Sequence, residues 1–384
     1  MPMKPLQKSH AFAAACFGMM FFGITMVALG SVLPSLSLKL ALTTMQKATL
    51  ASTLTASILA GSVIFGPVCD TYGHRTLFFS SCFAVVAGLA GIAFAPSMQW
   101  LLLSYVLIGI GGGVLNGQTN TITSDLFDDE STRNARLSLL GAFYGVGAIA
   151  ITLLVGTLGD IIDYKYLLLS LVVLLGIGSA VCFKAQFPAP THAQSFPLRD
   201  VFRMLRSPAL VVLSLVLLFE SSIESVTNNL VTSYFAGMKG VVLLLTVMMV
   251  ALTAARFFLT WLSKRMKPNT ILYSFFAVLF AGFALLPVAR NIAVAMTAMV
   301  LIGFGTAATY PIVLGQLGTR FKRLSGTAFG IAISIALAGS SLLNAFVGGV
   351  LLQYYPYVMM VAVVAMAVLY RTGARIVKAR QKHK

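Results

Sequence analysis

Two acidic side chains stand four residues apart inside an apolar run at 208–235. Glu220 and Glu224 therefore share one face of a helix, and Asn228 continues that face. Two carboxylates this close in a medium of low dielectric constant cannot both ionise cheaply, so we expect at least one to hold a proton. A proton-exchanging carboxyl is what proton coupling needs, and Glu224, which is closer to Asn228, is the preferred candidate. The alternative is that both acids only hydrogen-bond to a neighbouring helix.

Neutral amides form a second polar group. Asn116 and Asn120 share a face of the run 99–124, whereas Gln118 points elsewhere. Amides both donate and accept hydrogen bonds, which suits the hydroxyls of a sugar or another uncharged polyhydroxylated ligand. An interhelical polar clamp is the alternative interpretation. The further candidates for contact with a solute are Asn228, Asn229, Tyr144, Tyr310 and Asn344.

One basic residue lies within an apolar run. Arg256 could pair with Glu220 or Glu224, because an unpaired arginine in such a run is costly. It could equally extend its side chain to the end of the run, where Arg265 lies two turns away. A Tyr310-Pro311 pair is expected to break or bend the run 291–317, because proline lacks a backbone N–H.

The composition requires a membrane. Hydrophobic residues make up 58% of the 384 residues and charged residues only 10%, against about 25% in soluble domains. The sequence predicts an all-α polytopic protein with about twelve transmembrane helices in two pseudo-symmetric six-helix bundles. The predicted domains are 1–184, a cytoplasmic linker at 185–207, and 208–384 with a basic tail. The predicted spans are 11–36, 47–67, 76–95, 99–124, 135–158, 165–184, 208–235, 241–263, 269–288, 291–317, 325–352 and 355–371.

The net charge of +17 sets an orientation. With the N-terminus inside, all but six of the 27 Lys and Arg residues fall on the inner side, as the positive-inside rule requires. Both termini are therefore expected to be cytoplasmic, and the short termini and loops favour a prokaryotic inner membrane. No aromatic or fold signal for nucleic-acid binding accompanies the basic residues.

A short polar stretch separates the second and third runs. Gly66, Asp70, Gly73 and Arg75 follow the order G-x-x-x-D-x-x-G-x-R. We expect Gly66 and Pro67 to end the first of the two helices and Gly73 to permit the turn. A charged turn without a special role is the alternative.

This order resembles the loop between the second and third helices of the major facilitator superfamily. In that family the Asp lies at a helix N-terminus of the opposite half, where the helix dipole favours an anion. The resemblance implies two six-helix halves with the solute near mid-membrane at their interface. It also implies that Gly66, Asp70, Gly73 and Arg75 act as a conformational latch to the start of the run 325–352.

Two further segments resemble the fucose:proton symporter branch, which includes sodium- and proton-linked hexose carriers. They are Gly111–Asn120 and Phe219–Glu224 with the following Thr232-Ser233-Tyr234. Glu224 matches the branch's acid in the seventh helix. The chain departs from the branch elsewhere: Asn116 stands at the acid position of the fourth helix, the first span has no charge, and Asn228 or Asn229 replaces a frequent aromatic. The resemblance therefore does not extend to fucose itself.

The sequence thus predicts a secondary active transporter of a small polar solute, a sugar, that works by alternating access with proton coupling, sodium being the other candidate ion. Export of amphipathic drugs or lipids by proton antiport is the alternative, because many Met and Phe residues could form an adaptable wall. No enzymatic constellation, metal site or other cofactor is expected, because the four histidines are placed in loops or tails and the four cysteines lack ligand spacing. The expected partners are the solute and the lipid bilayer, with the chain as a monomer.

Overall fold

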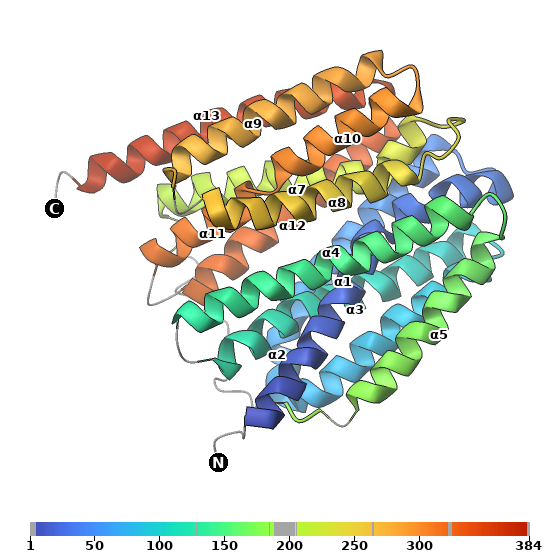
Figure 1. Cartoon of the computed structure of the whole chain (residues 1–384), viewed down its shortest axis with the longest axis horizontal. Coiled ribbons are helices and arrows are strands. Elements are labelled where there is room, and N and C mark those ends of the chain that lie inside the picture. The colour runs from blue at the N-terminus through green and yellow to red at the C-terminus, as the bar shows by residue number, and fades with distance from the viewer. Residues whose placement is uncertain are drawn as a thin grey trace. The chain divides into compact units, whose positions relative to one another are not determined.

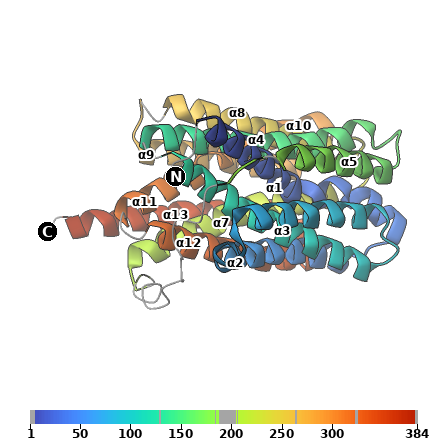
Figure 2. The ribbon, with the colours of Figure 1, turned by 90° about the horizontal axis from the view of Figure 1, so that it is seen from below.

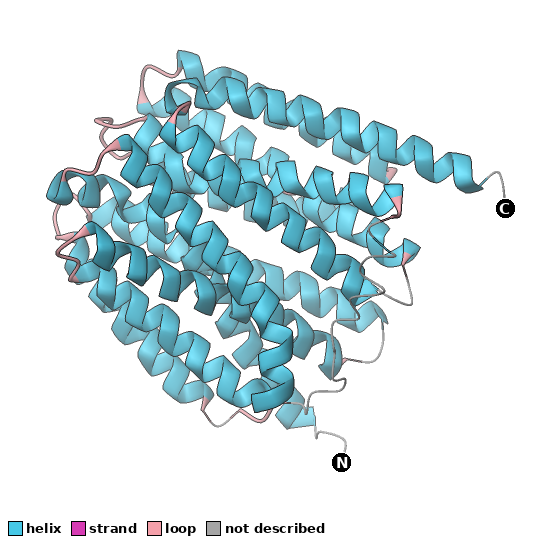
Figure 3. Ribbon diagram, turned by 180° about the vertical axis from the view of Figure 1, so that it is seen from behind, coloured by secondary structure: helices cyan, strands magenta, loops and turns pink. Residues whose placement is uncertain are grey.

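The computed structural model describes residues 5–127, 130–183, 185–187, 204, 206–262, 265–321 and 325–381. Every regular element within these ranges is helical, and no strand occurs in them (Figure 3). The chain divides into two compact units, Met1–Ser195 and Phe196–Lys384. The border between them falls inside the predicted linker at 185–207, most of which lies outside the described residues. The proposed role of that linker stays a prediction.

The described residues of the N-terminal unit form five helices, which Figure 1 labels. They are α1 (Pro5–Leu40), α2 (Thr44–Ala93), α3 (Met98–Leu126), α4 (Glu130–Leu158) and α5 (Tyr164–Cys182). Side-chain caps fix where three of them begin. Thr43 and Gln46 form a reciprocal capping box at the start of α2, Ser97 accepts from the backbone N–H of Trp100, and Asp163 accepts from that of Lys165.

The long helix α2 contains two spans, Thr44–Phe65 and Tyr72–Ala93. The backbone stays helical through Gly66 and Pro67, so the prediction that these two residues end the helix was wrong. Gly73 alone leaves helical geometry, with φ 76° and ψ 163°. A positive φ is strained for residues with a Cβ, which explains a glycine here. The predicted turn is therefore narrowed to a single residue.

The C-terminal unit contains seven α-helices and two short 3₁₀ turns among its described residues. They are α7 (Pro208–Tyr234), α8 (Leu243–Leu262), α9 (Pro268–Leu285), η1 (Leu286–Val288), α10 (Ile292–Thr306), α11 (Thr309–Arg320), α12 (Ser325–Gly349), η3 (Leu352–Tyr354) and α13 (Tyr355–Gln381). The last helix, α13, projects at its C-terminal end beyond the other helices of its unit (Figures 1 and 2). Helices α10 and α11 together make one span, Ile292–Leu317.

Eleven stretches within the described residues are long and apolar enough to cross a membrane, and α8 adds a shorter apolar stretch, Leu243–Leu259. These stretches correspond to the twelve predicted spans. One helix in each unit is more enclosed than the rest: 78% of the apolar window of α1 is buried and 67% of that of α7, against 22% for α5 and 33% for α13. Polar residues of α1 and α7 therefore face protein, whereas α5 and α13 present apolar side chains outward, as a lipid-facing helix must.

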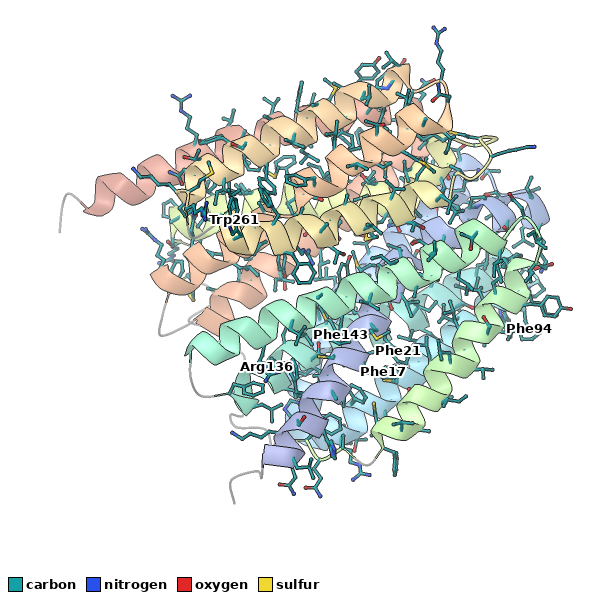
Figure 4. All side chains as sticks on the ribbon, viewed as in Figure 1. Phe17, Phe21, Phe94, Arg136, Phe143 and Trp261 are labelled. Carbon is teal, nitrogen blue, oxygen red and sulfur yellow. The ribbon has the colours of Figure 1, made fainter. Side chains whose placement is uncertain are left out.

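Cation–aromatic contacts occur at both ends of the N-terminal unit, where Arg136 and Phe94 mark opposite ends (Figure 4). The Arg136 guanidinium lies 5.1 Å from the ring centre of Phe12 and 5.3 Å from that of Phe127. At the other end, the Lys165 ammonium lies 4.6 Å from the ring centre of Phe94. Such contacts suit the two membrane–water boundaries, where a side chain needs both a polar and an apolar neighbour.

Candidate functional site

The two predicted acids lie on the enclosed helix of the C-terminal unit. Glu220 is 2% exposed and Glu224 is 8% exposed, and both are on α7. The Ser221 hydroxyl lies 3.4 Å from Oε2 of Glu220 and can donate to it, while Oε1 of Glu220 has no hydrogen-bond partner among the described residues. A buried ionised carboxylate is costly unless its oxygens are paired. The hydrogen bonds available to Glu220 therefore provide little to stabilise a permanent negative charge.

Arg256 of α8 is half-buried, and its charge acts on Glu220, as does the charge of Glu224. The position of Arg256 thus fits the predicted partnership with the acids. Another basic residue lies near the C-terminal end of α8. The guanidinium of Arg265 lies 4.3 Å from the ring centre of Trp261, which Figure 4 shows at that end of the unit. The role of Arg256 as a charge partner stays a prediction.

The span 292–317 is broken where the sequence predicted. Helix α10 ends at Thr306 and α11 begins at Thr309, two residues before Pro311. Pro311 has no N–H to donate to the carbonyl of Ala307, so the helical ladder is interrupted there. Tyr310 follows the break, is half-buried, and lies within electrostatic reach of Glu220, Glu224 and Arg256. Four predicted site residues from α7, α8 and α11 are therefore brought together inside one unit.

The amides of α7 have different environments. The amide nitrogen of Asn229 lies 3.1 Å from Oδ1 of Asn344 and 3.4 Å from the hydroxyl of Ser225. Asn344 on α12 donates in turn to the Ser225 hydroxyl at 2.9 Å and to the carbonyl of Ser340 at 2.8 Å. This cluster joins α7 to α12, so Asn229 and Asn344 have a structural role beside their predicted solute contacts. Asn228, by contrast, is fully buried and its amide has no hydrogen-bond partner among the described residues.

The predicted amide group of α3 is spread over different environments. Asn116 is half-buried, while Asn120 is exposed and donates to the Asn116 carbonyl at 2.8 Å. Gln118 does point elsewhere: it is fully buried and its amide donates to the carbonyl of His74, next to the break in α2. This contact of Gln118 was not predicted, although a glutamine in an apolar span itself indicates that a polar group is held there.

Histidines were placed in loops or tails, and for two of them this was wrong. His10 lies in α1, and His74 lies in α2, where it is 3% exposed and its Nδ1 is 3.3 Å from the Sγ of Cys69. His192 and His383 lie outside the described residues. No cluster of three or more His, Cys, Asp and Glu side chains that could hold a metal ion occurs within the described ranges.

Arg75 of the predicted latch has a partner within its own unit. Its guanidinium donates to the carbonyl of Phe183, just past the end of α5, at 2.9 Å, and lies 4.7 Å from the ring centre of that residue. Carbonyls at a helix C-terminus carry partial negative charge, which favours a cation there. The side chains of Asp70 and Ser325 lie outside what the structure describes, so the latch itself stays a prediction.

Tyr144 packs against α1 and is 4% exposed, with its ring centre 5.6 Å from that of Phe22. Two tyrosine hydroxyls of the C-terminal unit make hydrogen bonds that were not predicted. Tyr355 donates to the Thr227 hydroxyl at 2.8 Å. Tyr370 accepts from the amide of Gln316 at 2.7 Å and lies 2.6 Å from Oδ1 of Asn269. The available signal was a tyrosine inside an apolar span, whose hydroxyl needs a partner when buried.

Comparison with known proteins identifies the fold and the family. The solved structure of a D-xylose-proton symporter superposes with a TM-score of 0.77, covering 94% of this chain and 97% of that chain, at 11% sequence identity. Multidrug resistance protein 3 of Bacillus subtilis is 30% identical over 110 residues, 29% of this chain and 21% of that protein. The efflux pump PmrA of Streptococcus pneumoniae is 23% identical over 154 residues, 39% of this chain and 38% of that protein.

These sequence relatives are thus matched over less than half of their own lengths, and the likeness to the symporter shows the fold alone. The family model called Major Facilitator Superfamily, however, matches residues 15–344, most of the chain. Together with the apolar helices, this match indicates a multi-pass membrane protein of a transporter family. The chain belongs to the Major Facilitator Superfamily.

Proposed function

We propose that the protein moves a small, uncharged, polyhydroxylated solute, a sugar, by alternating access coupled to protons, with both termini in the cytoplasm of a prokaryotic cell. The observation that carries this proposal is the acid pair of α7: two buried carboxyl groups one helical turn apart, within electrostatic reach of a single arginine. With both acids ionised this group has one negative charge in excess. One bound proton makes it neutral, and that is a coupling stoichiometry of one.

The amides support a neutral solute. Asn228 and, in the other unit, Asn116 offer donors and acceptors but no charge. The structural neighbour described above is itself a D-xylose-proton symporter. The pairing of sugar with proton that we propose for this chain is of the same kind.

The acid pair is tested by replacing each carboxyl with its neutral isostere in proteoliposomes. Glu224→Gln is expected to abolish uphill sugar uptake driven by a pH gradient, while exchange of labelled for unlabelled sugar across the membrane continues, because exchange needs no net proton movement. Glu220→Gln provides the comparison, and the variant that loses uphill uptake but keeps exchange identifies the coupling carboxyl. Undiminished gradient-driven uptake in both variants would remove the acid pair from the mechanism.

Export of amphipathic cations is the second candidate function. One similar protein is named a multidrug resistance protein and another a multi-drug resistance efflux pump. An acid pair with one excess negative charge could bind an organic cation in place of a proton. The two functions are separated by expression in a bacterium that lacks its own efflux pumps and sugar carriers. Restored growth on a sugar supports import, whereas increased tolerance of tetraphenylphosphonium with no growth on sugar supports export.

A further inference from the structure

Helix α7 carries several buried polar atoms that the surrounding residues leave without hydrogen bonds. Five of its buried side-chain polar atoms have no hydrogen-bond partner among the described residues, and no other described helix has more than two such atoms. These atoms belong to Glu220, Asn228, Asn229 and Ser233. The great majority of buried polar groups in native proteins are paired, so a concentration of unpaired atoms on one helix calls for an explanation.

Asn228 is the extreme case. It is 0% exposed, and both its amide nitrogen and its amide oxygen lack partners; no other described side chain has two unpartnered buried atoms. Its neighbour Asn229 is 1% exposed but binds Asn344 and Ser225. Two adjacent asparagines thus behave differently. The Asn229 amide joins α7 to α12, whereas the Asn228 amide is buried and has no hydrogen-bond partner among the described residues.

A buried amide without hydrogen bonds lowers the stability of the fold. A ligand that hydrogen-bonds to the amide removes this cost. We propose that Asn228 is the residue of the C-terminal unit that selects the solute, by exchanging hydrogen bonds with a hydroxyl group of an uncharged polyhydroxylated molecule. A hydroxyl both donates and accepts, and so matches both halves of the amide at once. This inference rests on the proposed function and names the residue that would discriminate among solutes.

The charges around Asn228 argue for a neutral ligand. Glu224 lies one turn earlier on the same helix face and Glu220 two turns earlier. These acids disfavour an anionic solute. A cation would be attracted by the acids, but it would leave the donor half of the amide unmatched. An uncharged hydroxyl matches both the donor and the acceptor of the amide without either penalty.

The experiment compares Asn228→Leu with Ser225→Ala, a change at a buried polar residue of the same helix, in the purified full-length chain in lipid nanodiscs. The probes are D-xylose, D-glucose and myo-inositol as neutral polyols, D-glucuronate as an anion and tetraphenylphosphonium as a cation. Melting temperature without solute and dissociation constant with each probe are both measured. Asn228→Leu is expected to keep or raise the melting temperature, because it removes an unpaired polar group, and to weaken binding of the bound polyol by about tenfold or more.

Ser225→Ala is the matched control, because it removes the hydroxyl that Asn229 and Asn344 contact. It is expected to lower the melting temperature by a few degrees while changing the dissociation constant less than about threefold. Asn228→Ser, which keeps a donor and an acceptor, should regain part of the lost affinity and guards against a general folding defect in the leucine variant. No recovery in Asn228→Ser, or unchanged affinity in Asn228→Leu, overturns the inference.

The outcomes also separate this inference from the proposed function. A polyol that binds the wild type and Asn228→Leu equally well defeats only the role of Asn228. If no polyol binds the wild type, the neutral-ligand assignment is overturned; binding of tetraphenylphosphonium in that case also contradicts sugar transport and favours export.

Discussion

The two units build the same contact, between their first and fifth spans, in different ways. In the N-terminal unit α1 meets α4 through glycines: a Cβ at Gly23 would overlap the carbonyl oxygen of Tyr144, and one at Gly147 would overlap that of Met20. In the C-terminal unit α7 meets α12 through hydrogen bonds between the Ser225–Asn229 segment and Asn344. We call these two contacts the glycine seam and the amide seam.

The difference is consistent with where the two buried acids lie. A contact formed by close backbone approach needs no polar side chain. The buried polar residues of α1 accordingly carry only hydroxyl groups. A seam held by amides and hydroxyls makes a helix face on which acids can be tolerated, because polar neighbours reduce the cost of burying them. The acids Glu220 and Glu224 accordingly lie on α7, beside the amide seam, and the proton step that we propose belongs to the C-terminal unit.

The largest effect should come from widening the glycine seam. Gly147→Leu places a side chain into the backbone of α1 and is expected to destabilise the protein by about 3 kcal/mol or more, the upper range for overpacking, because the clashing atoms are backbone and cannot move aside. Gly141→Leu on the same helix is the control, since a Cβ there meets nothing within 4 Å. Thermal unfolding of both variants in nanodiscs provides the measurement, and equal melting temperatures would disprove the seam.

Breaking the amide seam should cost less. Asn344→Leu removes the hydrogen bonds to Asn229 and Ser225 and leaves those two side chains buried. We expect the free energy of unfolding to fall by about 1–2 kcal/mol, because each interhelical hydrogen bond in a membrane protein contributes little. Leu342→Ala on the same helix is 72% exposed and should be near neutral. A loss in Asn344→Leu as large as that in Gly147→Leu would contradict the difference drawn between the two seams.

The smallest effect should come from the hydroxyl pair that joins α7 to α13. Tyr355→Phe deletes the donor to Thr227, which keeps its own bond to the Ile223 carbonyl at 2.6 Å. We expect a loss of about 1 kcal/mol. Tyr357→Phe serves as the control, because that side chain is 54% exposed. A chemical-denaturation midpoint identical in Tyr355→Phe and wild type would show that the bond adds nothing to the stability of this face of α7.

Much of the fold could be predicted from the sequence, because a helix that crosses a bilayer must be about 20 apolar residues long and that length is visible in one dimension. The break before Pro311 was equally visible, since a missing N–H acts locally. The prediction that the helix ends at Pro67 was wrong. Proline is tolerated inside a membrane helix where neighbouring groups satisfy the carbonyl that it leaves without a donor, and a local sequence pattern does not show those neighbours.

The candidate site was predictable in its residue types but not in its pairings. That buried acids, amides and one arginine exist follows from the sequence, because polar residues stand out in apolar spans. Only tertiary packing decides which of the two amides of α7 hydrogen-bonds within the unit and which does not. Asn228 and Asn229 are identical in type and adjacent in the chain, yet they lie about 100° apart around the helix, and only Asn229 reaches Asn344 of α12.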